Sequence, residues 1–198
     1  MYALNRPPVR LRRRTVRVPI HHIQGQMSDS QPTLRLAQTP ADYEAFGQVC
    51  RQYVDWCRGR YRDTPWIMEE VFGYQSLDDE LKVLAQKYGP PNGRTLLAFV
   101  GDQVVAAGAY RRLSDTTCEL KRLYVTDAAR GLGLGRKLSD AIMAQAKQDG
   151  FSLMQLDTGD RLAEAIAMYE SMGFSRIPPY QQYPERLMPH LVFMERPL

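Results

Sequence analysis

Apolar and polar residues follow different periods along the chain, and each change of period predicts a boundary between elements. Residues 33–38 alternate as in a short strand, and residues 39–60 then place apolar side chains three and four apart, which predicts a helix. Thr39 is a favourable helix cap, and Pro40 suits the first turn. Residues 60–75 are rich in aromatic side chains but lack a clean period, so the sequence predicts no regular element there.

The middle of the chain predicts a second helix followed by two strands. Residues 76–89 have helical spacing, and Ser76 and Asp79 are placed as a capping box. Residues 94–113 form two alternating runs about a Gly-Asp dipeptide, which is typical of an antiparallel hairpin.

Residues 116–125 alternate again and predict a third strand of the same antiparallel run. In an unbroken strand, successive side chains point to opposite faces of the sheet. One face would then carry Glu119, Lys121, Leu123 and Val125, and the other Cys118, Leu120, Arg122 and Tyr124.

The last third of the chain predicts a strand–helix–strand crossover. The helix extends to about Lys147, and residues 150–158 form a buried strand. Residues 161–173 predict another helix, and residues 174–177 and 189–195 predict two short closing strands with a proline-rich loop between them. The element order indicates an α/β (α+β) fold, with a mixed, mostly antiparallel central sheet flanked by helices.

The positive charge of the chain is concentrated at its start. The chain has a formal net charge of +4, but six of its 26 basic residues lie in residues 1–26, which hold no acidic residue; 20 basic residues then face 22 acidic ones. We expect residues 1–30 to be a basic, disordered extension and residues 31–198 to form one domain. The nearly neutral body argues against nucleic acid as a partner, although binding through the arginine arm stays an alternative. The sequence has no apolar run of the ~20 residues that span a bilayer, so no membrane association is expected.

The cysteines do not predict a disulfide or a metal site. Cys50, Cys57 and Cys118 are odd in number and form no CxxC motif. Cys50 and Cys57 are seven apart on one helical face, where small buried side chains are expected. A reducing cytoplasm fits this usage best.

The stretch Arg130-Gly-Leu-Gly-Leu-Gly-Arg136 combines bare backbone with positive charge at the start of a predicted helix. Glycines let several N–H groups point at one anion, and the helix N-terminus adds partial positive charge, so the stretch predicts a phosphate or diphosphate cradle. A tight structural turn is the alternative. The stretch lacks the Lys-Ser/Thr pair of a P-loop, and its glycine spacing departs from the dinucleotide-binding fingerprint.

Residues 130–135 resemble the R/Q-x-x-G-x-G/A loop of the GNAT superfamily of acyl-CoA-dependent N-acyltransferases. The preceding stretch Glu-Leu-Lys-Arg-Leu-Tyr-Val and the later Ala-Met-Tyr-Glu-Ser-Met-Gly-Phe (167–174) are similar to the other two landmarks of that family, in the same order. The resemblance covers roughly residues 33–198, and its specific part is 116–177.

The resemblance implies acetyl-CoA as cosubstrate and no metal. It implies that the strand before the loop pairs through its backbone with the pantetheine, and that the loop amides hold the pyrophosphate. The cofactor-binding residues would be Leu123, Tyr124, Val125, Arg130, Gly131, Leu132, Gly133, Leu134, Gly135 and Arg136.

The resemblance also implies a proton donor for the leaving thiolate at Tyr169; the alternative is a half-buried core tyrosine. Many members have an asparagine seven residues before this tyrosine, where this chain has Leu162. The contact of that asparagine must be absent or replaced, with Asp157, Thr158 and Asp160 as candidates.

Glu119 is the candidate base, acting directly or through a water, because the alternation places it on the face of Leu123 and Val125. The alternative is a surface glutamate paired with Lys121 or Arg122. A Cys-His nucleophilic pair has thin support, so direct transfer in a ternary complex is expected.

The acceptor amine should lie near residues 60–75 and the 178–189 loop, where Glu69, Glu70 and aromatic residues would suit a cation. A hydrophobic lid with solvated glutamates is the alternative. The sequence therefore predicts an N-acetyltransferase that acts on a primary amine of a small molecule. An amino acid, a polyamine, an aminoglycoside-like drug and a protein N-terminus stay open as acceptors. A non-catalytic acyl-CoA-binding module and a homodimer also stay open.

Overall fold

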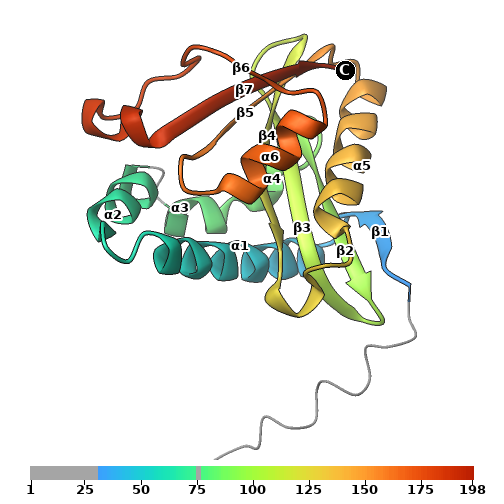
Figure 1. The fold of residues 1–198 in the computed structure, drawn as a ribbon. Coiled ribbons are helices and arrows are strands. Elements are labelled where there is room, and N and C mark those ends of the chain that lie inside the picture. Colours follow the sequence, from blue (N-terminus) through green and yellow to red (C-terminus); the bar gives the residue numbers. More distant parts are fainter. Residues whose placement is uncertain (1–30, 75–76) are drawn as a thin grey trace, which may run out of the picture. The chain divides into compact units, whose positions relative to one another are not determined.

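The computed structural model describes residues 31–74 and 77–198, of which Tyr74 is described by its backbone alone. The predicted basic extension and Ser76 of the predicted capping box lie outside the described residues. Figure 1 shows a central sheet with helices on both sides.

The sheet has the spatial order β1-β2-β3-β4-β5-β7-β6 among the described residues. Its strands are β1 (Thr33–Leu36), β2 (Gly93–Val100), β3 (Gln103–Arg112), β4 (Thr117–Val125), β5 (Leu153–Gly159), β6 (Ser175–Arg176) and β7 (Leu191–Pro197). β4 and β5 pair in parallel, and the other neighbours pair antiparallel. The predicted mixed, mostly antiparallel sheet and the crossover from β4 to β5 are confirmed.

The helices are α1 (Pro40–Arg60), α2 (Pro65–Tyr74), α3 (Leu77–Lys82), α4 (Leu84–Tyr88), α5 (Leu134–Gln148) and α6 (Ala163–Ser171). Short 3₁₀ helices cover Asp127–Ala129 and Glu185–His190. The single helix predicted over 76–89 is wrong in one respect, because it divides at Val83 into α3 and α4.

The sequence prediction missed α2. Its apolar residues Ile67, Met68, Val71 and Phe72 follow one another at helical spacing, and three of them are buried. This short repeat turns one side of α2 toward α1, with which it shares a hydrophobic cluster. The surrounding aromatic residues hid the period in the sequence.

The start of α1 is fixed by the cap that the sequence predicts. The Thr39 hydroxyl accepts a hydrogen bond from the Asp42 backbone N–H at 3.2 Å, and the Asp42 carboxylate accepts one from the Thr39 N–H at 3.0 Å. Asp42 also binds Arg35 of β1 at 2.6 Å. Because the capping carboxylate joins β1 to α1, the helix enters the fold at a fixed angle.

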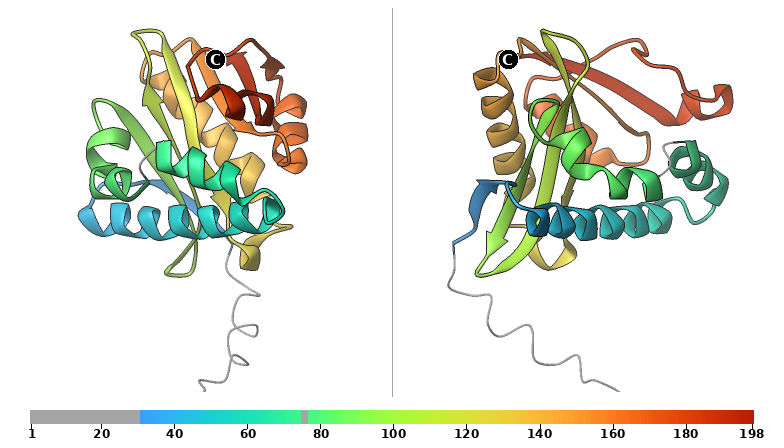
Figure 2. Two further views of the ribbon diagram at one scale, coloured as in Figure 1. Left: turned by 90° about the vertical axis from the view of Figure 1, so that its left-hand side faces the viewer. Right: turned by 180° about the vertical axis from the view of Figure 1, so that it is seen from behind.

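Helices cover both faces of the sheet (Figures 1 and 2). α5 packs against β2, β3 and β4 on one face, and α1 and α4 pack against β2 and β3 on the other. The predicted core positions of α5 are all buried, namely Leu134, Leu138, Ile142 and Ala146. Cys50 and Cys57 are buried on α1 as expected.

A β-bulge interrupts β4 next to the start of the crossover. Two β4 residues, Arg122 and Leu123, face the single β3 residue Gly108, because the register shifts between Ala107 and Ala109. Arg122 has a φ of 56°, in the left-handed region. A Cβ atom at Gly108 would lie 2.8 Å from Leu123 Cδ1, so the glycine makes room for the bulge.

The bulge overturns the predicted alternation of side chains along β4. Leu123 and Ile142 of α5 both border Gly108, which places Leu123 on the α5 face. Glu119 instead pairs with Arg111, and Arg111 interacts electrostatically with Tyr88 of α4, on the opposite face. The prediction that Glu119 shares a face with Leu123 and Val125 is therefore wrong, because the inserted residue reverses the alternation after Lys121.

Candidate functional site

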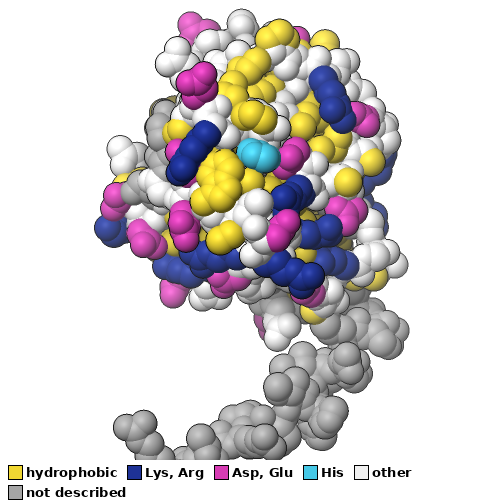
Figure 3. Space-filling view, turned by 60° about the vertical axis from the view of Figure 1, so that its left-hand side comes forward, with side chains coloured by type: hydrophobic (Ala, Val, Ile, Leu, Met, Phe, Trp, Pro, Cys, Tyr) yellow, Lys and Arg dark blue, Asp and Glu magenta, His cyan; other side chains and the backbone are white. Residues whose placement is uncertain are grey.

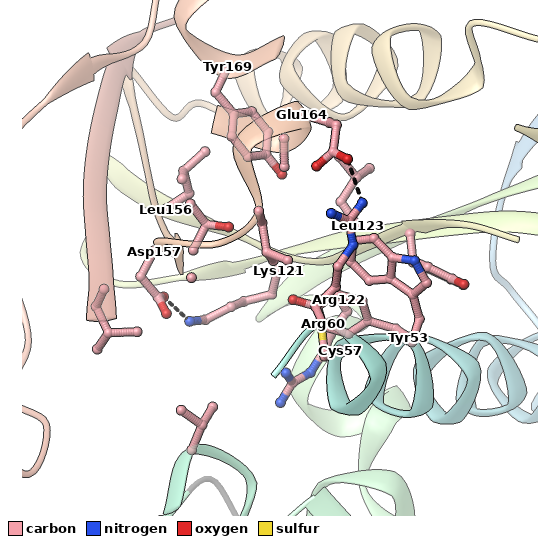
Figure 4. A pocket seen from close by; sticks show the side chains of 18 of the residues that line it. Tyr53, Cys57, Arg60, Lys121, Arg122, Leu123, Leu156, Asp157, Glu164 and Tyr169 are labelled. Carbon is pink, nitrogen blue, oxygen red and sulfur yellow. Dashed lines mark hydrogen bonds and ion pairs between the residues drawn. The ribbon is translucent and has the colours of Figure 1, made fainter. Parts of the chain in front are cut away.

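β4 and β5 separate shortly after they begin to pair. Their parallel register in the described residues covers three positions and ends at Glu119 and Gln155. A cavity of about 330 Å³ lies beyond this point, lined by β4 residues 120–125 and β5 residues 156–159. The diverging strands therefore leave backbone of β4 facing a space that a ligand can enter (Figure 4).

The glycine loop lies at one end of this cavity. Gly131 and Gly133 have positive φ values of 84° and 67°, and Gly133 is the N-cap of α5 without a side-chain cap bond. A Cβ atom at either glycine would meet nothing within 4 Å, so both positions face open space. Backbone donors at an uncapped helix N-terminus beside open space fit an anionic group such as a diphosphate.

The two arginines of the loop take different places. Arg130 lines the cavity, lies over the Trp56 ring at 4.9 Å, and pairs with Asp127 at 2.8 Å. Arg136 donates a hydrogen bond to Ser171 Oγ at 2.8 Å and so joins α5 to the end of α6. Of the two loop arginines, Arg130 is therefore the one whose guanidinium could contact a ligand in the cavity.

The other residues predicted to bind the cofactor lie along one path. Leu123, Tyr124, Val125 and Gly135 line the cavity. Leu132 is 48% exposed in the loop, whereas Leu134 is buried in the core beneath it. The path runs from the loop along β4 toward Tyr169.

Tyr169 of α6 lines the same cavity and is 6% exposed. Its ring packs edge-on against Phe174 at 5.6 Å between centroids. Burial, and then the negative charge of Asp157, raise the pKa of Tyr169 above its ordinary value. The hydroxyl therefore keeps its proton at neutral pH and can donate it. Figure 4 shows the ring beside Leu156 and Leu123.

Glu119 is fully buried, and the cavity lining does not include it. Its carboxylate binds Arg111 at 2.5 Å, Lys121 at 3.0 Å and the Tyr180 hydroxyl at 2.8 Å. The sequence alternative of a pairing with Lys121 is confirmed, but the glutamate lies in the interior and not at the surface.

Asp157 of β5 lines the cavity and forms an ion pair with Lys121 (Figure 4). Burial alone would raise the pKa of Asp157, but the Lys121 ammonium outweighs burial and lowers it. Burial likewise opposes the charge of Lys121, and its two carboxylate partners raise the pKa of Lys121 above its ordinary value. Both groups therefore stay charged at neutral pH.

Three residues of the loop 177–184 complete this charged cluster, and the sequence analysis did not single them out. Tyr183 donates a hydrogen bond to Asp157 at 3.0 Å, and Gln181 reaches both Asp157 and Glu119 at 3.2 Å. Tyr180 binds Glu119. No pattern in a proline-rich loop signals contacts to strands that lie far away in the sequence.

One side of the cavity is apolar. We call this side the apolar wall; it consists of Tyr53, Ile67, Met68, Val71, Phe72 and Leu162. Through this wall α2 borders the cavity, whereas the prediction that the acceptor lies near residues 60–75 stays a prediction. The predicted glutamates do not take part in it. Glu70 pairs with Arg186, and Glu69 borders a separate depression with Arg58 and Asp78.

Leu162 stands where many similar proteins have an asparagine, and its side chain is buried in the wall. Of the three candidates for a replacement, Asp157 and Thr158 line the cavity. Asp160 instead accepts a hydrogen bond from Tyr61 at 2.9 Å and contacts His190 at 3.2 Å.

Cys57 lines the cavity, but burial raises its pKa to about 11. A thiol with this pKa is protonated at neutral pH and a poor nucleophile. His190 also lines the cavity, and the face drawn in Figure 3 shows hydrophobic, acidic and basic side chains close together around a histidine. His190 packs against Trp66 and Asp160, and no hydrogen bond between His190 and Cys57 occurs among the described residues.

Within the described ranges, no helix is long and apolar enough to cross a membrane. The same part of the chain holds no group of three or more His, Cys, Asp or Glu side chains that could bind a metal ion.

Fold and cavity together define an α/β domain with a cavity between two separating parallel strands, beside a glycine loop. A model of the acetyltransferase (GNAT) family matches residues 51–174. The chain is 32% identical over 170 residues to an uncharacterized N-acetyltransferase of Schizosaccharomyces pombe, across 85% of this chain and 96% of the relative. The chain belongs to the GNAT acetyltransferase family.

One further relative is similar to the chain in sequence, and one solved structure is similar to it in fold. The uncharacterized N-acetyltransferase YjgM of Escherichia coli is 37% identical over 108 residues, which cover 53% of this chain and 65% of the relative. The PaiA N-acetyltransferase of Thermoplasma acidophilum was solved in complex with coenzyme A. It has a TM-score of 0.62 and 17% identity, covering 85% of this chain and 99% of that one, and so shares the fold. The predicted fold class and family are confirmed.

Proposed function

We propose that this protein transfers an acetyl group from acetyl-CoA to a primary amine of a small molecule, by direct attack in a ternary complex. One observation carries the proposal: a single cavity joins the glycine loop at the start of α5 to the buried hydroxyl of Tyr169 and to the apolar wall. An acyl donor and an acceptor can therefore meet inside one space. Family membership supports the reaction class.

The residues that would hold acetyl-CoA are those the sequence singled out. The amides of residues 131–136 would hold the diphosphate beside the open space at Gly131 and Gly133, and Arg130 would add a full charge. Backbone groups of Leu123, Tyr124 and Val125 border the space where β4 has left β5, which suits the amide-rich pantetheine.

When bound, acetyl-CoA supplies an activated acetyl thioester. The Leu123 backbone N–H, at the bulge, would donate a hydrogen bond to the carbonyl oxygen as negative charge develops there. The Tyr169 hydroxyl, protonated because of its burial, would give its proton to the leaving sulfur. The bulge would thus take part in the reaction through the Leu123 N–H, besides setting the course of β4.

The base is assigned to Asp157 in place of Glu119. The argument for Glu119 rested on an alternation that the bulge reverses, and its carboxylate is buried behind Lys121. Asp157 lines the cavity and is ionised at neutral pH, so its carboxylate is placed to accept the proton of the amine; the lowered pKa makes it a weaker base than an ordinary aspartate. Glu119 would act through Lys121 as a positioning residue.

Direct transfer is favoured over a covalent acyl-enzyme. The cysteine on the cavity wall, Cys57, has a pKa raised to about 11, and no base activates it among the described residues. The second candidate function is an acyl-CoA-binding module without catalysis, which the same cavity would also serve.

One experiment separates the two functions. The protein is mixed with acetyl-CoA and a panel of primary amines, and free thiol is measured as coenzyme A is released. Amine-dependent release supports the transferase. Coenzyme A binding by calorimetry without thiol release from any amine favours the binding module, and absence of both contradicts the glycine-loop assignment.

A further inference from the structure

The charges around the cavity restrict the acceptor. Of the described residues that line it, four carry positive charge and two carry negative charge. The cations are Arg60, Lys121, Arg122 and Arg130, and the anions are Asp157 and Glu164. Arg122 and Arg130 pair with Glu80 and Asp127, which lie outside the lining, so the described lining offers no unpaired carboxylate to a ligand with several ammonium groups.

Both carboxylates of the lining already have cationic partners. Asp157 pairs with Lys121, and Glu164 pairs with Arg60 at 2.5 Å (Figure 4). Arg60 also lies over the Trp56 ring at 4.9 Å, which helps to fix it beside Glu164. Each ammonium group on the acceptor has to compete with these cations for a carboxylate, so a diamine faces this competition twice.

The apolar wall offers such a charge the ring faces of Tyr53 and Phe72 but little hydrogen bonding, and the Arg122 guanidinium already lies over the Phe72 ring at 5.9 Å. Ile67, Met68, Phe72 and Leu162 are each at most 9% exposed, and they present hydrocarbon and ring surface to the cavity. An ammonium group placed against them would lose its water and gain no hydrogen-bond partner, which is costly. A hydrocarbon chain placed there would instead gain from leaving water.

Resting on the proposed transferase function, we propose that the acceptor is a primary monoamine whose remaining body is apolar. Its amine nitrogen meets Asp157, and its hydrocarbon body packs on the apolar wall. Polyamines and aminoglycosides, which the sequence left open, are disfavoured as acceptors because their further ammonium groups would face that wall.

Matched linear amines test the proposal on the full-length chain. Acetylation of propylamine, butylamine, pentylamine and hexylamine is compared with that of 1,6-diaminohexane at one pH. Each added methylene should raise kcat/KM about fourfold until the wall is covered, the factor that corresponds to about 0.8 kcal/mol per buried methylene. Hexylamine should exceed 1,6-diaminohexane, which differs by one ammonium group, by at least about 100-fold.

A charge placed on the wall should reverse this preference. Val71→Asp adds a carboxylate at the wall, and we expect it to lower kcat/KM for hexylamine at least tenfold and to raise it for 1,6-diaminohexane. Val83→Asp makes the same change at a position that is 41% exposed and outside the cavity lining. It should leave both values as in the wild type. Should Val71→Asp fail to fold, the wild-type comparison still decides.

Amine binding to the protein saturated with coenzyme A is measured separately by calorimetry. Equal or better acetylation of the diamine overturns the monoamine proposal while the transferase function stands. Tight hexylamine binding without acetylation supports the apolar wall and contradicts the transferase function. Absence of hexylamine binding overturns the assignment of the wall.

Discussion

Glu80 of α3 accepts two hydrogen bonds from the guanidinium of Arg122, at 2.7 Å and 3.1 Å. Both side chains are buried, and Lys87 and Tyr88 bind the same carboxylate at 2.5 Å and 3.0 Å. Arg122 is the β4 residue with the positive φ at the bulge. This ion pair therefore holds α3 against the position in β4 where the alternation of side chains between the two sheet faces is reversed. The bulge at the candidate site therefore depends on a residue 42 positions earlier in the sequence.

Glu80→Ala should destabilise the fold strongly, because it leaves the Arg122 charge buried without this partner. We expect the free energy of unfolding to fall by about 3–5 kcal/mol, measured by urea denaturation. Asp55→Ala is the control, since it removes one member of an exposed pair with Arg58 and should change stability little. A loss for Glu80→Ala no larger than the control would contradict the buried anchor.

The same carboxylate predicts how stability changes with pH. Burial would raise the pKa of Glu80, but Arg122 and Lys87 outweigh it and lower the pKa from 4.5 to about 2. The folded state therefore binds this proton less readily than the unfolded state does. The stabilisation from Glu80 is fully present above pH 4.5 and is lost as the pH falls toward 2.

Urea denaturation between pH 6 and pH 2 measures this effect. The difference in stability between wild type and Glu80→Gln should be constant above about pH 5 and should shrink by about 3 kcal/mol toward pH 2. A difference that stays constant across this range would show that the pKa of Glu80 is not lowered in the folded protein.

The sequence predicted much of this fold, because short local patterns indicate most of its helices and strands. The apolar spacing of α5 and the cap of α1 at Thr39 are properties of short stretches, and the structure confirms both. The bulge at Arg122 was not predictable, since it depends on Gly108 in β3 and on Glu80 in α3. A single inserted position was enough to move Glu119 away from the predicted face.

The candidate site, like the fold, has one part that the sequence indicates and one part that it does not. The glycine loop is a contiguous motif, so residue types alone indicated an anion site there. The cluster around Asp157 is assembled from β4, β5 and the loop 177–184, so its ion pairs join residues that are far apart in the sequence. The roles proposed for Tyr169 and for the loop amides stay predictions, and the experiments below address them.

Gly133→Val should abolish measurable binding of coenzyme A. The substitution places a branched side chain in the open space beside the helix start and requires a positive φ, a strain of about 1–2 kcal/mol. Gly101→Val is a matched control in the β2–β3 turn, where φ is 57° and a Cβ atom would likewise meet nothing within 4 Å. Calorimetry should show normal binding for Gly101→Val. Similar affinity in both variants would refute the anion site at the loop.

Tyr169→Phe should lower kcat by about 100-fold at nearly constant affinity for coenzyme A, because it removes the proton donor and keeps the ring. Tyr110→Phe is the control, since Tyr110 is also buried, but its hydroxyl binds Asp149 on the α5 face. Tyr110→Phe should lower the melting temperature without lowering kcat. Wild-type kcat in Tyr169→Phe would reduce Tyr169 to a packing residue. In the wild type, the raised pKa of Tyr169 predicts no loss of rate from its ionisation up to pH 10.

Asp157→Asn and Glu119→Gln should differ in their dependence on pH, and the difference identifies the base. If Asp157 accepts the proton of the amine, its amide variant must wait for solvent to deprotonate the amine. The deficit in kcat/KM of Asp157→Asn should then be about 100-fold at pH 7 and should shrink as the pH approaches the pKa of the amine. Glu119→Gln keeps the hydrogen-bonding shape beside Lys121, so its deficit should stay below about tenfold and not change with pH.

Thermal unfolding of both variants tests whether the loss of one carboxylate has also disrupted the remaining ion pair of Lys121. A larger, pH-dependent deficit in Glu119→Gln would return the role of base to Glu119, acting through a water behind the lysine.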